Sequence, residues 1–390
     1  MKEGSILPLE RILTAEESNS IKEAILKAIN TFELWGYNYI KLPAFEHYEA
    51  QERSLGEKVK DVIVIKDIES KELVSLRADF TAQVVRSVSF LKPPYFPQRL
   101  YYFGTLFFAD KKTNESFQVG LELIGVKEIE GDAEVISALY EYIKSLGIKD
   151  AVVSVGHVNI VGKIIRSLPE HDREEARKAF KERNISFLKD TFGNTQIPLL
   201  PFIQDRESAL RTLSELGMDE ERKQLEKLGD LLTRSGVKYI YDLSEVRELP
   251  YYTGVVFEIY HPQIGSPIAG GGRYDGLSRL YGEDFCATGG SVYIDACLSI
   301  LENRKSEKDF FIVELSTEKN FAPRLAEILR GKGYKVGLEL TQRNLEHSLS
   351  YAFWEGYKKV LVLYDKRSVR LYTTVKECET MSLKEFLELF

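Results

Sequence analysis

Three consecutive glycines, Gly270 to Gly272 in the stretch SPIAGGGRYDGL, constrain the fold of this chain more than any other feature. Glycine is the default residue where the backbone needs a positive φ, or where a ligand or a second strand comes too close for a Cβ. A tight turn between a strand and a helix would satisfy the pattern, and so would the floor of a pocket. The run is neither a P-loop nor the spaced G-x-G-x-x-G of dinucleotide-binding folds. The glycines alone therefore leave both interpretations open.

The composition indicates a soluble globular protein of two or three domains, because the chain has 390 residues and 44% hydrophobic content. Its formal net charge of -7 gives no broad electrostatic reason to bind nucleic acid or an anionic membrane. No apolar run of signal-peptide or membrane-spanning length occurs, so we expect a cytoplasmic protein without membrane contact. The three cysteines lie far apart and the five histidines are scattered, which predicts reduced thiols, no metal site and no cofactor.

Hydrophobic periodicity predicts an α+β fold for the first three quarters of the chain. EESNSIKEAILKAINTFELWGY predicts a helix that Gly36 ends, and a second helix is expected over 132–146. A charged helical block over about 158–235 is typical of an insertion. We expect strands of an antiparallel sheet in YNYIKLPAFE, where the strand stops at Pro43, and at DVIVIKDI, ELVSLRA, QRLYYFGTLFF and FQVGLELIGVKEI. A buried strand is expected at AVVSVGHV, and further strands at VKYIYDL, GVVFEIYH and ATGGSVYI.

A domain boundary is expected near residue 306, because DACLSILEN reads as a helix and the charged, solvated run RKSEKD follows it. Beyond this run, strands at FFIVEL, YKVGLEL and KKVLVLYD alternate with helices over 321–332 and 343–356 and with a final amphipathic helix. This order predicts a small α/β unit with parallel strands. We therefore expect a domain over 1–306, with the insertion, and a second domain over 309–390.

Several stretches resemble the histidyl-tRNA synthetase family, a class II synthetase fold, over nearly the whole chain. GYNYIKLPAFE, with Pro43, is similar to the family's first motif, which forms its dimer; YYFGTLFF with ESFQVGLELIG is similar to the second. LRADFTAQVVR resembles the amino-acid-binding segment, whereas VRELPYYTGVVFE and GGGRYDGL resemble two segments specific to histidine recognition. The resemblance implies a class II synthetase-like antiparallel sheet with helices, a homodimer, and an anticodon-binding-like domain over 309–390.

The resemblance also implies a histidine-binding pocket, in which the glycines let a strand pass underneath while Tyr274 points inward. Free histidine needs carboxylates for its ammonium, partners for its ring nitrogens and aromatic walls. Asp79 stands where the family usually has Glu, which shortens its reach. Read singly, Gln118 and Glu122 could face solvent from a strand, and the tyrosines could be core residues. The implied histidine-binding set is Asp79, Thr81, Gln118, Glu122, Arg247, Tyr251, Tyr252 and Tyr274.

Departures from the family pattern predict that synthetase activity is lost and that no catalytic residue remains. Class II enzymes stabilise the charge on the α-phosphate with two arginines, but Phe108 and Cys297 occupy those positions here. The loop ADKKTNES is short and lacks the family's ERPQ run, and RELP, which begins with Arg247, replaces the usual RGLD. Loss of one such donor lowers a rate by about 10²–10³-fold.

A family member with a histidine pocket but without activation chemistry resembles the regulatory subunits of ATP phosphoribosyltransferase. This resemblance implies a hetero-oligomer with the short catalytic subunit, activation of the first step of histidine biosynthesis, and feedback regulation by histidine. Residues 309–390 fit less well, because many such subunits stop before this domain; its balanced charge predicts that it does not bind tRNA. Two alternatives stay open: a divergent histidyl-tRNA synthetase, and a binding protein that senses uncharged tRNA.

Overall fold

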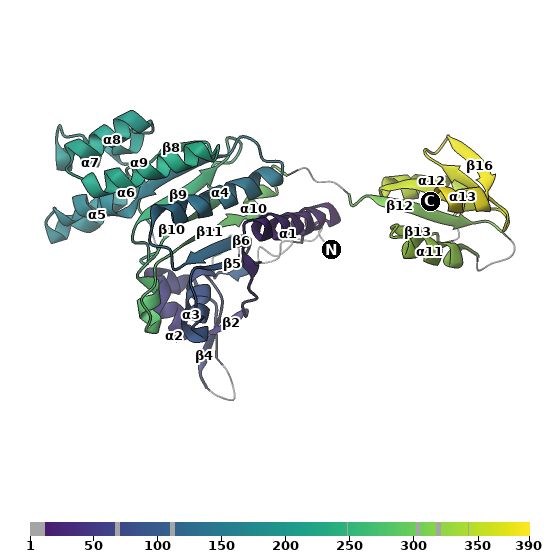
Figure 1. Ribbon diagram of the computed structural model, residues 1–390, viewed down its shortest axis with the longest axis horizontal. Helices are drawn as coiled ribbons and strands as arrows, with labels where there is room; N and C mark the ends of the chain where they lie inside the picture. Colours follow the sequence, from purple (N-terminus) through teal and green to yellow (C-terminus); the bar gives the residue numbers. More distant parts are fainter. Residues whose placement is uncertain are drawn as a thin grey trace, which may run out of the picture. The chain divides into compact units, whose positions relative to one another are not determined.

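The computed structural model describes residues 12–66, 71–109, 114–247, 249–301, 305–316, 321–341 and 343–390 (Figure 1). Contacts between Cα atoms divide the chain into two compact units. The larger unit contains residues 20–302, and the smaller contains residues 303–390 together with the segment 13–19. The domain bounds expected from the sequence, 1–306 and 309–390, stay a prediction.

An eight-stranded sheet with the order β1-β5-β6-β11-β10-β9-β7-β8 forms the centre of the larger unit. All neighbours from β5 to β7 pair antiparallel, whereas β1 with β5 and β7 with β8 pair parallel. The predicted α+β class with a mainly antiparallel sheet is confirmed. The strands are β1 (Asn38–Tyr39), β5 (Gln98–Phe107), β6 (Glu115–Ile124), β7 (Val152–His157), β8 (Tyr239–Tyr241), β9 (Val255–Tyr260), β10 (Ala269–Arg273) and β11 (Ala287–Tyr293).

Helices cover both faces of this sheet. On one face, α1 (Ala15–Leu34) and α4 (Ile129–Ser145) pack into the main apolar core. Helix α1 forms because Ala24, Ala28 and Phe32 recur every four residues on its buried face, and Gly36 follows it at a φ of 79°. On the other face, α3 (Thr81–Leu91) packs with β5, β6 and the segment around Tyr251 in a second apolar cluster.

The strand expected in YNYIKLPAFE, β1, ends before Pro43 as predicted. The expectation of one antiparallel sheet is wrong, because a further strand, β2 (Phe45–His47), follows Pro43 and forms a separate three-stranded sheet with β4 (Leu73–Leu76) and β3 (Val64–Lys66). Pro43 lies between β1 and β2 and has no backbone N–H to donate to a ladder, which explains the break. Helix α2 (Tyr48–Leu55) and the 3-10 helix η1 (Gly56–Asp61) follow β2.

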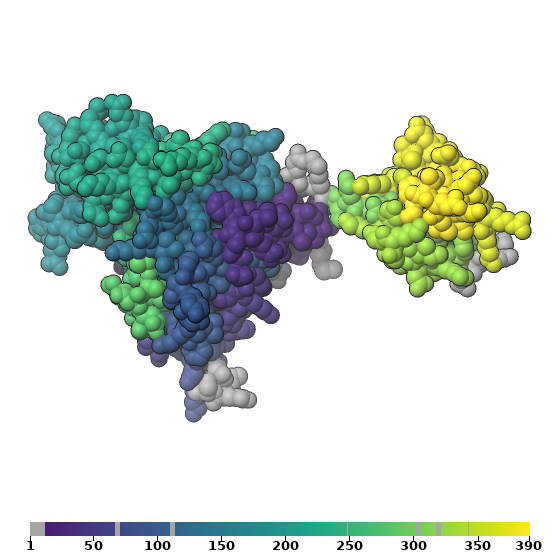
Figure 2. Space-filling view, viewed as in Figure 1, coloured from purple at the N-terminus to yellow at the C-terminus, as the bar shows by residue number. Residues whose placement is uncertain are grey.

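The segment 158–235 is helical throughout its regular elements, which form one continuous teal body in the space-filling view (Figure 2). Its leucines and alanines join the main core cluster beside α4. The elements are α5 (Val158–Arg166), η2 (Glu170–Asp172), α6 (Arg173–Lys181), α7 (Ile185–Phe192), η3 (Ile197–Phe202), α8 (Arg206–Glu215) and α9 (Asp219–Arg234). After β10 comes η4 (Leu277–Tyr281), and the helix expected at DACLSILEN is shorter than predicted, as α10 (Ile294–Cys297).

The smaller unit is a five-stranded sheet in the order β13-β12-β14-β15-β16. Strands β12, β13 and β14 are parallel as predicted, but the sequence interpretation missed the antiparallel β15 and β16. Parallel pairing needs a long crossover, and the link from β14 to β15 is too short for one. The elements are β12 (Lys308–Glu314), α11 (Phe321–Gly331), β13 (Val336–Leu338), α12 (Leu345–Trp354), β14 (Tyr357–Leu363), β15 (Ser368–Tyr372), β16 (Cys378–Ser382) and α13 (Leu383–Leu389).

Candidate functional site

A cavity of about 580 Å³ lies in the larger unit, where α3 approaches the eight-stranded sheet. Gly270 of β10 and Gly290 of β11 contribute to its lining from the sheet. Further lining residues come from the start of α3, the segment around Tyr251, strands β5, β6 and β11, α2 and η1. The volume falls in the usual range for small-molecule sites, about 300–1,000 Å³.

The glycines are required by close packing of the backbone and of one buried carboxyl group. A Cβ at Gly271 would lie 2.1 Å from the carbonyl oxygen of Gly289 on the neighbouring strand. A Cβ at Gly289 would lie 1.5 Å from Oε2 of Glu122, its partner in the register of β11 and β6. Of the two interpretations that the sequence left open, this geometry favours a pocket floor over a turn.

Glu122 is fully buried and is held by three hydroxyl groups. Thr81 Oγ1 donates to Oε1 at 2.8 Å, the Tyr102 hydroxyl donates to Oε1 at 3.1 Å, and the Tyr274 hydroxyl donates to Oε2. Burial raises the pKa of the Glu122 carboxyl to about 8, and the negative charge of Asp79 acts in the same direction. Burial thus favours the protonated form of this carboxyl, whereas the three hydrogen bonds favour the carboxylate.

Asp79 lines the cavity just before α3 begins at Thr81. Its Oδ1 accepts the backbone N–H of Ala82 at 2.6 Å, and its Oδ2 accepts the hydroxyl of Tyr251 at 3.1 Å. Burial raises the pKa of Asp79, whereas these two hydrogen bonds lower it. A cationic group in the cavity would stabilise the carboxylate further.

Arg247 lies behind the aromatic wall and is not among the lining residues. Its Nη1 donates to Glu258 at 2.8 Å and its Nη2 donates to the carbonyl of Phe257 at 2.7 Å, while Glu245 lies 3.2 Å from Nε. The guanidinium is 5.7 Å from the centre of the Tyr252 ring. Two carboxylates therefore already neutralise this arginine.

The eight residues expected at the histidine site divide into two groups. Five line the cavity: Asp79, Thr81, Gln118, Tyr251 and Tyr252. Glu122, Arg247 and Tyr274 do not, although Glu122 and Tyr274 are joined to the wall through Thr81.

Tyr274 is 1% exposed, so its side chain lies behind the wall of the cavity. The roles of all eight residues stay a prediction. Sequence reasoning missed Tyr102, Ser291 and Tyr293, which also line the cavity. Tyr102 and Leu106 of β5 line the cavity, as does Phe108 just after the strand, so the even spacing of these positions was the available signal.

The two positions that lack the family's arginines differ in their surroundings. Phe108 lines the cavity. Cys297 is fully buried in the main core cluster, where burial raises the pKa of its thiol to about 12. Among the described lining residues, Lys58 of η1 is the only lysine or arginine.

Among the described residues, no group of histidine, cysteine or acidic side chains has a geometry that could hold a metal ion. None of the described helices is both long and apolar enough to cross a membrane.

Comparison with known proteins identifies the family. The family model for histidyl-tRNA synthetase matches residues 11–297. The chain is 46% identical over 386 residues, covering 99% of both chains, to the ATP phosphoribosyltransferase regulatory subunit of Aquifex aeolicus. It is 29% identical over 374 residues, covering 89% of this chain and 88% of the other, to the histidine–tRNA ligase of Saccharolobus solfataricus.

A solved structure from Bacillus halodurans, described as an ATP phosphoribosyltransferase regulatory subunit/histidyl-tRNA synthetase, has the same fold. The TM-score is 0.81 at 26% identity, with 94% of this chain and 99% of the other covered. The chain therefore belongs to the family of ATP phosphoribosyltransferase regulatory subunits, which has the histidyl-tRNA synthetase fold.

Proposed function

We propose that this chain is a non-catalytic regulatory subunit that activates the short catalytic subunit of ATP phosphoribosyltransferase and confers feedback inhibition by histidine. The observation that carries the proposal is the contrast within one cavity. Asp79 and a wall of tyrosines suit a small cationic ligand, whereas Phe108 stands at a position where a synthetase needs an arginine. Ligand binding without adenylate chemistry is the function that this cavity supports best.

Histidine suits the polar groups of the cavity. The Asp79 carboxylate would accept hydrogen bonds from the ligand's ammonium group. Each hydroxyl has a single proton, and Thr81 and Tyr102 both donate theirs to Glu122. Their remaining lone pairs can accept an imidazole N–H from the cavity, and the rings of Tyr251 and Tyr252 would exclude water.

Activation of an amino acid would not be supported by these residues. Adenylate formation builds negative charge on the α-phosphate, and preorganised donors must meet that charge. The phenyl ring of Phe108 has no donor, Cys297 is sequestered in the core, and Arg247 is occupied by Glu245 and Glu258.

We also propose a homodimer formed through the segment that resembles the dimer motif. Leu34, Tyr39 and Phe45 are 77%, 46% and 58% exposed, and they lie on α1, β1 and β2 around that segment. Apolar side chains that gather on a surface in this way are typical of subunit interfaces.

Reconstitution tests the function. The purified chain is mixed with the short catalytic subunit of the same organism, and phosphoribosyl-ATP formation is followed with and without histidine. A ligand shifts a partner only through its different affinities for two states of the complex, with coupling of about 1–3 kcal/mol. We expect the chain to raise the rate and histidine to lower it about fivefold or more.

Asp79→Asn is the matched control, because it removes the charge for the ammonium group and keeps the shape of the side chain. We expect this variant to activate the catalytic subunit as the wild type does, but to need a much higher histidine concentration for inhibition. If the two proteins do not co-elute and the rate is unchanged by this chain, the regulatory proposal is wrong. Binding of uncharged tRNA would then become the leading alternative.

A further inference from the structure

Arg273 ends β10, one residue before Tyr274, and is 6% exposed. Buried ion pairs are a poor means of stabilising a fold, because desolvation offsets most of their attraction. Their best-attested use is to select one geometry among several. We therefore expect the guanidinium of Arg273 to fix the geometry of the segments that it contacts.

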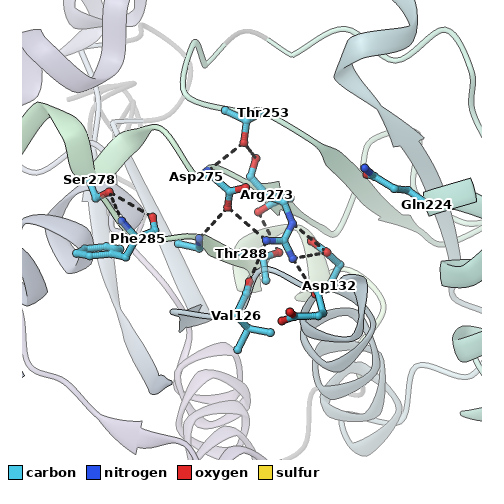
Figure 3. A network of polar contacts seen from close by, with 12 residues as sticks. Val126, Asp132, Gln224, Thr253, Arg273, Asp275, Ser278, Phe285 and Thr288 are labelled. Atoms are coloured by element: carbon cyan, nitrogen blue, oxygen red, sulfur yellow. Dashed lines mark hydrogen bonds and ion pairs between the residues drawn. The ribbon is translucent and has the colours of Figure 1, made fainter. Parts of the chain in front are cut away.

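The guanidinium of Arg273 joins three segments of the larger unit, as Figure 3 shows. On α4, Asp132 Oδ2 accepts from Nε at 3.0 Å and from Nη2 at 2.5 Å. Ahead of α4, the carbonyl oxygens of Val126 and Glu128 accept from Nη1 at 2.9 Å and from Nη2 at 3.1 Å. Asp275 Oδ1 lies 3.3 Å from Nη1. Only the planar fork of an arginine can donate in all these directions.

Hydrogen bonds also fix the backbone on both sides of Tyr274. The carbonyl of Arg273 accepts the N–H of Thr253 at 2.8 Å, and the Thr253 hydroxyl accepts the N–H of Asp275 at 3.0 Å. The carbonyl of Ala287 accepts the N–H of Tyr274 at 2.8 Å, while Asp275 Oδ1 accepts the N–H of Ala287 at 3.0 Å. Asp275 thus links the guanidinium to the backbone frame that holds the tyrosine.

Arg273 and Tyr274 direct their side chains to opposite faces of the sheet, as neighbours in an extended chain do. The arginine reaches α4 on one face, and the tyrosine reaches Glu122 on the cavity face. An anchor on the helix face therefore sets the position of a hydroxyl behind the cavity wall.

The attachment of α4 to the sheet does not itself require Arg273. Arg99 on β5 already donates to Glu134 of α4 at 2.7 and 3.0 Å, and apolar side chains fill the space between helix and sheet. Glu134 lies two residues after Asp132, so the two ion pairs tie neighbouring parts of one helix to the sheet. They differ in that Arg99 is not adjacent to a tyrosine that contacts Glu122.

We propose that Arg273 is a positioning residue of the ligand site: held by Asp132, it keeps the Tyr274 hydroxyl on Glu122. The inference rests on the proposed function for one of its two tests, which measures the affinity for histidine. The second test measures the titration of Glu122 and needs no ligand.

A double-mutant cycle provides the first test. Histidine binding to the full-length chain, alone and with the catalytic subunit, is measured by calorimetry for Arg273→Lys, Tyr274→Phe and the double variant. If the arginine acts through the tyrosine, Arg273→Lys weakens binding about tenfold in the wild type but less than about twofold in the Tyr274→Phe background. The matched control Arg99→Lys should change the affinity less than about twofold. A merely structural role would give the same factor in both backgrounds and would overturn the proposal.

Titration of Glu122 provides the second test, by ¹³C NMR of chains labelled in glutamate, with Glu122→Gln as the assignment control. A hydrogen bond from Tyr274 favours the carboxylate, so its loss should move the titration midpoint of Glu122 to higher pH. We expect this shift in both Tyr274→Phe and Arg273→Lys. A midpoint that moves in the first variant and stays in the second contradicts the proposal.

The two readouts separate the two hypotheses. If the wild type binds no histidine either alone or with the catalytic subunit, the histidine proposal fails. The titration of Glu122 then decides the role of Arg273 by itself. Thermal unfolding is recorded for every variant. Should Arg273→Lys not fold, Asp132→Asn enters both tests in its place, because it removes the charge that anchors the guanidinium and keeps the arginine.

Discussion

Replacing Glu122 by glutamine should change how the stability of the larger unit depends on pH. The carboxyl has a pKa of about 8 in the folded chain and an ordinary value of 4.5, mainly because of its burial. Between these values the folded state binds the proton more tightly than the unfolded state, so stability from this group falls as the pH rises. At 1.36 kcal/mol per pKa unit, the loss between pH 4.5 and pH 8 is on the order of 4 kcal/mol.

Glutamine is isosteric and uncharged, so Glu122→Gln should remove this dependence. We expect the variant to be within about 1 kcal/mol of the wild type at pH 5 and more stable by several kcal/mol at pH 9. Other carboxyls with raised pKa values, such as Glu46 at about 6 and Glu245 at about 7, occur in both proteins and cancel in the difference.

Urea unfolding followed by tryptophan fluorescence is a suitable assay, since the chain has two tryptophans. Trp354 lies in the smaller unit, and a Trp354→Phe background leaves Trp35, whose indole N–H donates to Glu141 of α4 at 3.0 Å. The remaining signal reports the larger unit alone. Parallel stability curves for wild type and Glu122→Gln from pH 5 to pH 9 would refute the reasoning.

Three further predictions concern the site and the assembly. The purified chain should catalyse no histidine-dependent exchange between ATP and pyrophosphate, because Phe108 and Cys297 offer no charged donor; a measurable exchange rate would disprove this. Light scattering should give a dimer for the wild type and a smaller species for Phe45→Glu, which places a charge on the proposed interface; a wild-type monomer at all concentrations would contradict the dimer. Gly289→Ala should prevent stable folding of the larger unit, since its methyl group would overlap Glu122, and cooperative unfolding like that of the wild type would count against this packing.

The fold was predictable where the sequence carries strong periodicity. The four-residue repeat of α1 and the helical spacing within 158–235 each reflect one buried face. The prediction was incomplete where a short segment depends on what packs around it. The stop at Pro43 was expected, but not that β2, β3 and β4 form a second sheet, and β15 with β16 form an edge hairpin with a weakly apolar pattern.

The sequence indicated which segments form the site, but not how their side chains are oriented. Resemblance indicated Asp79, Thr81 and Gln118, and all three line the cavity. It could not indicate that Arg247 is occupied by Glu245 and Glu258, because that pairing depends on how the chain folds back from Arg247 to β9. Nor could the resemblance show that Tyr102, which is not among the eight residues expected at the histidine site, donates a hydrogen bond to Glu122.

The wall and the floor of the cavity differ in how much each residue depends on its neighbours. This difference explains how Phe108 can stand in the wall while the packing of the floor is kept. Behind the floor, Gly289 is small because Glu122 fills the space, and Glu122 needs the hydroxyls of Thr81, Tyr102 and Tyr274 because a buried carboxyl without partners is costly. A change in any of these residues leaves the others unsatisfied. Phe108 at the wall belongs to no such network, so the arginine of a synthetase can be replaced there without disturbing the floor. What remains is a preorganised pocket whose occupancy can favour one state of a complex, and this is the property that a regulatory subunit needs.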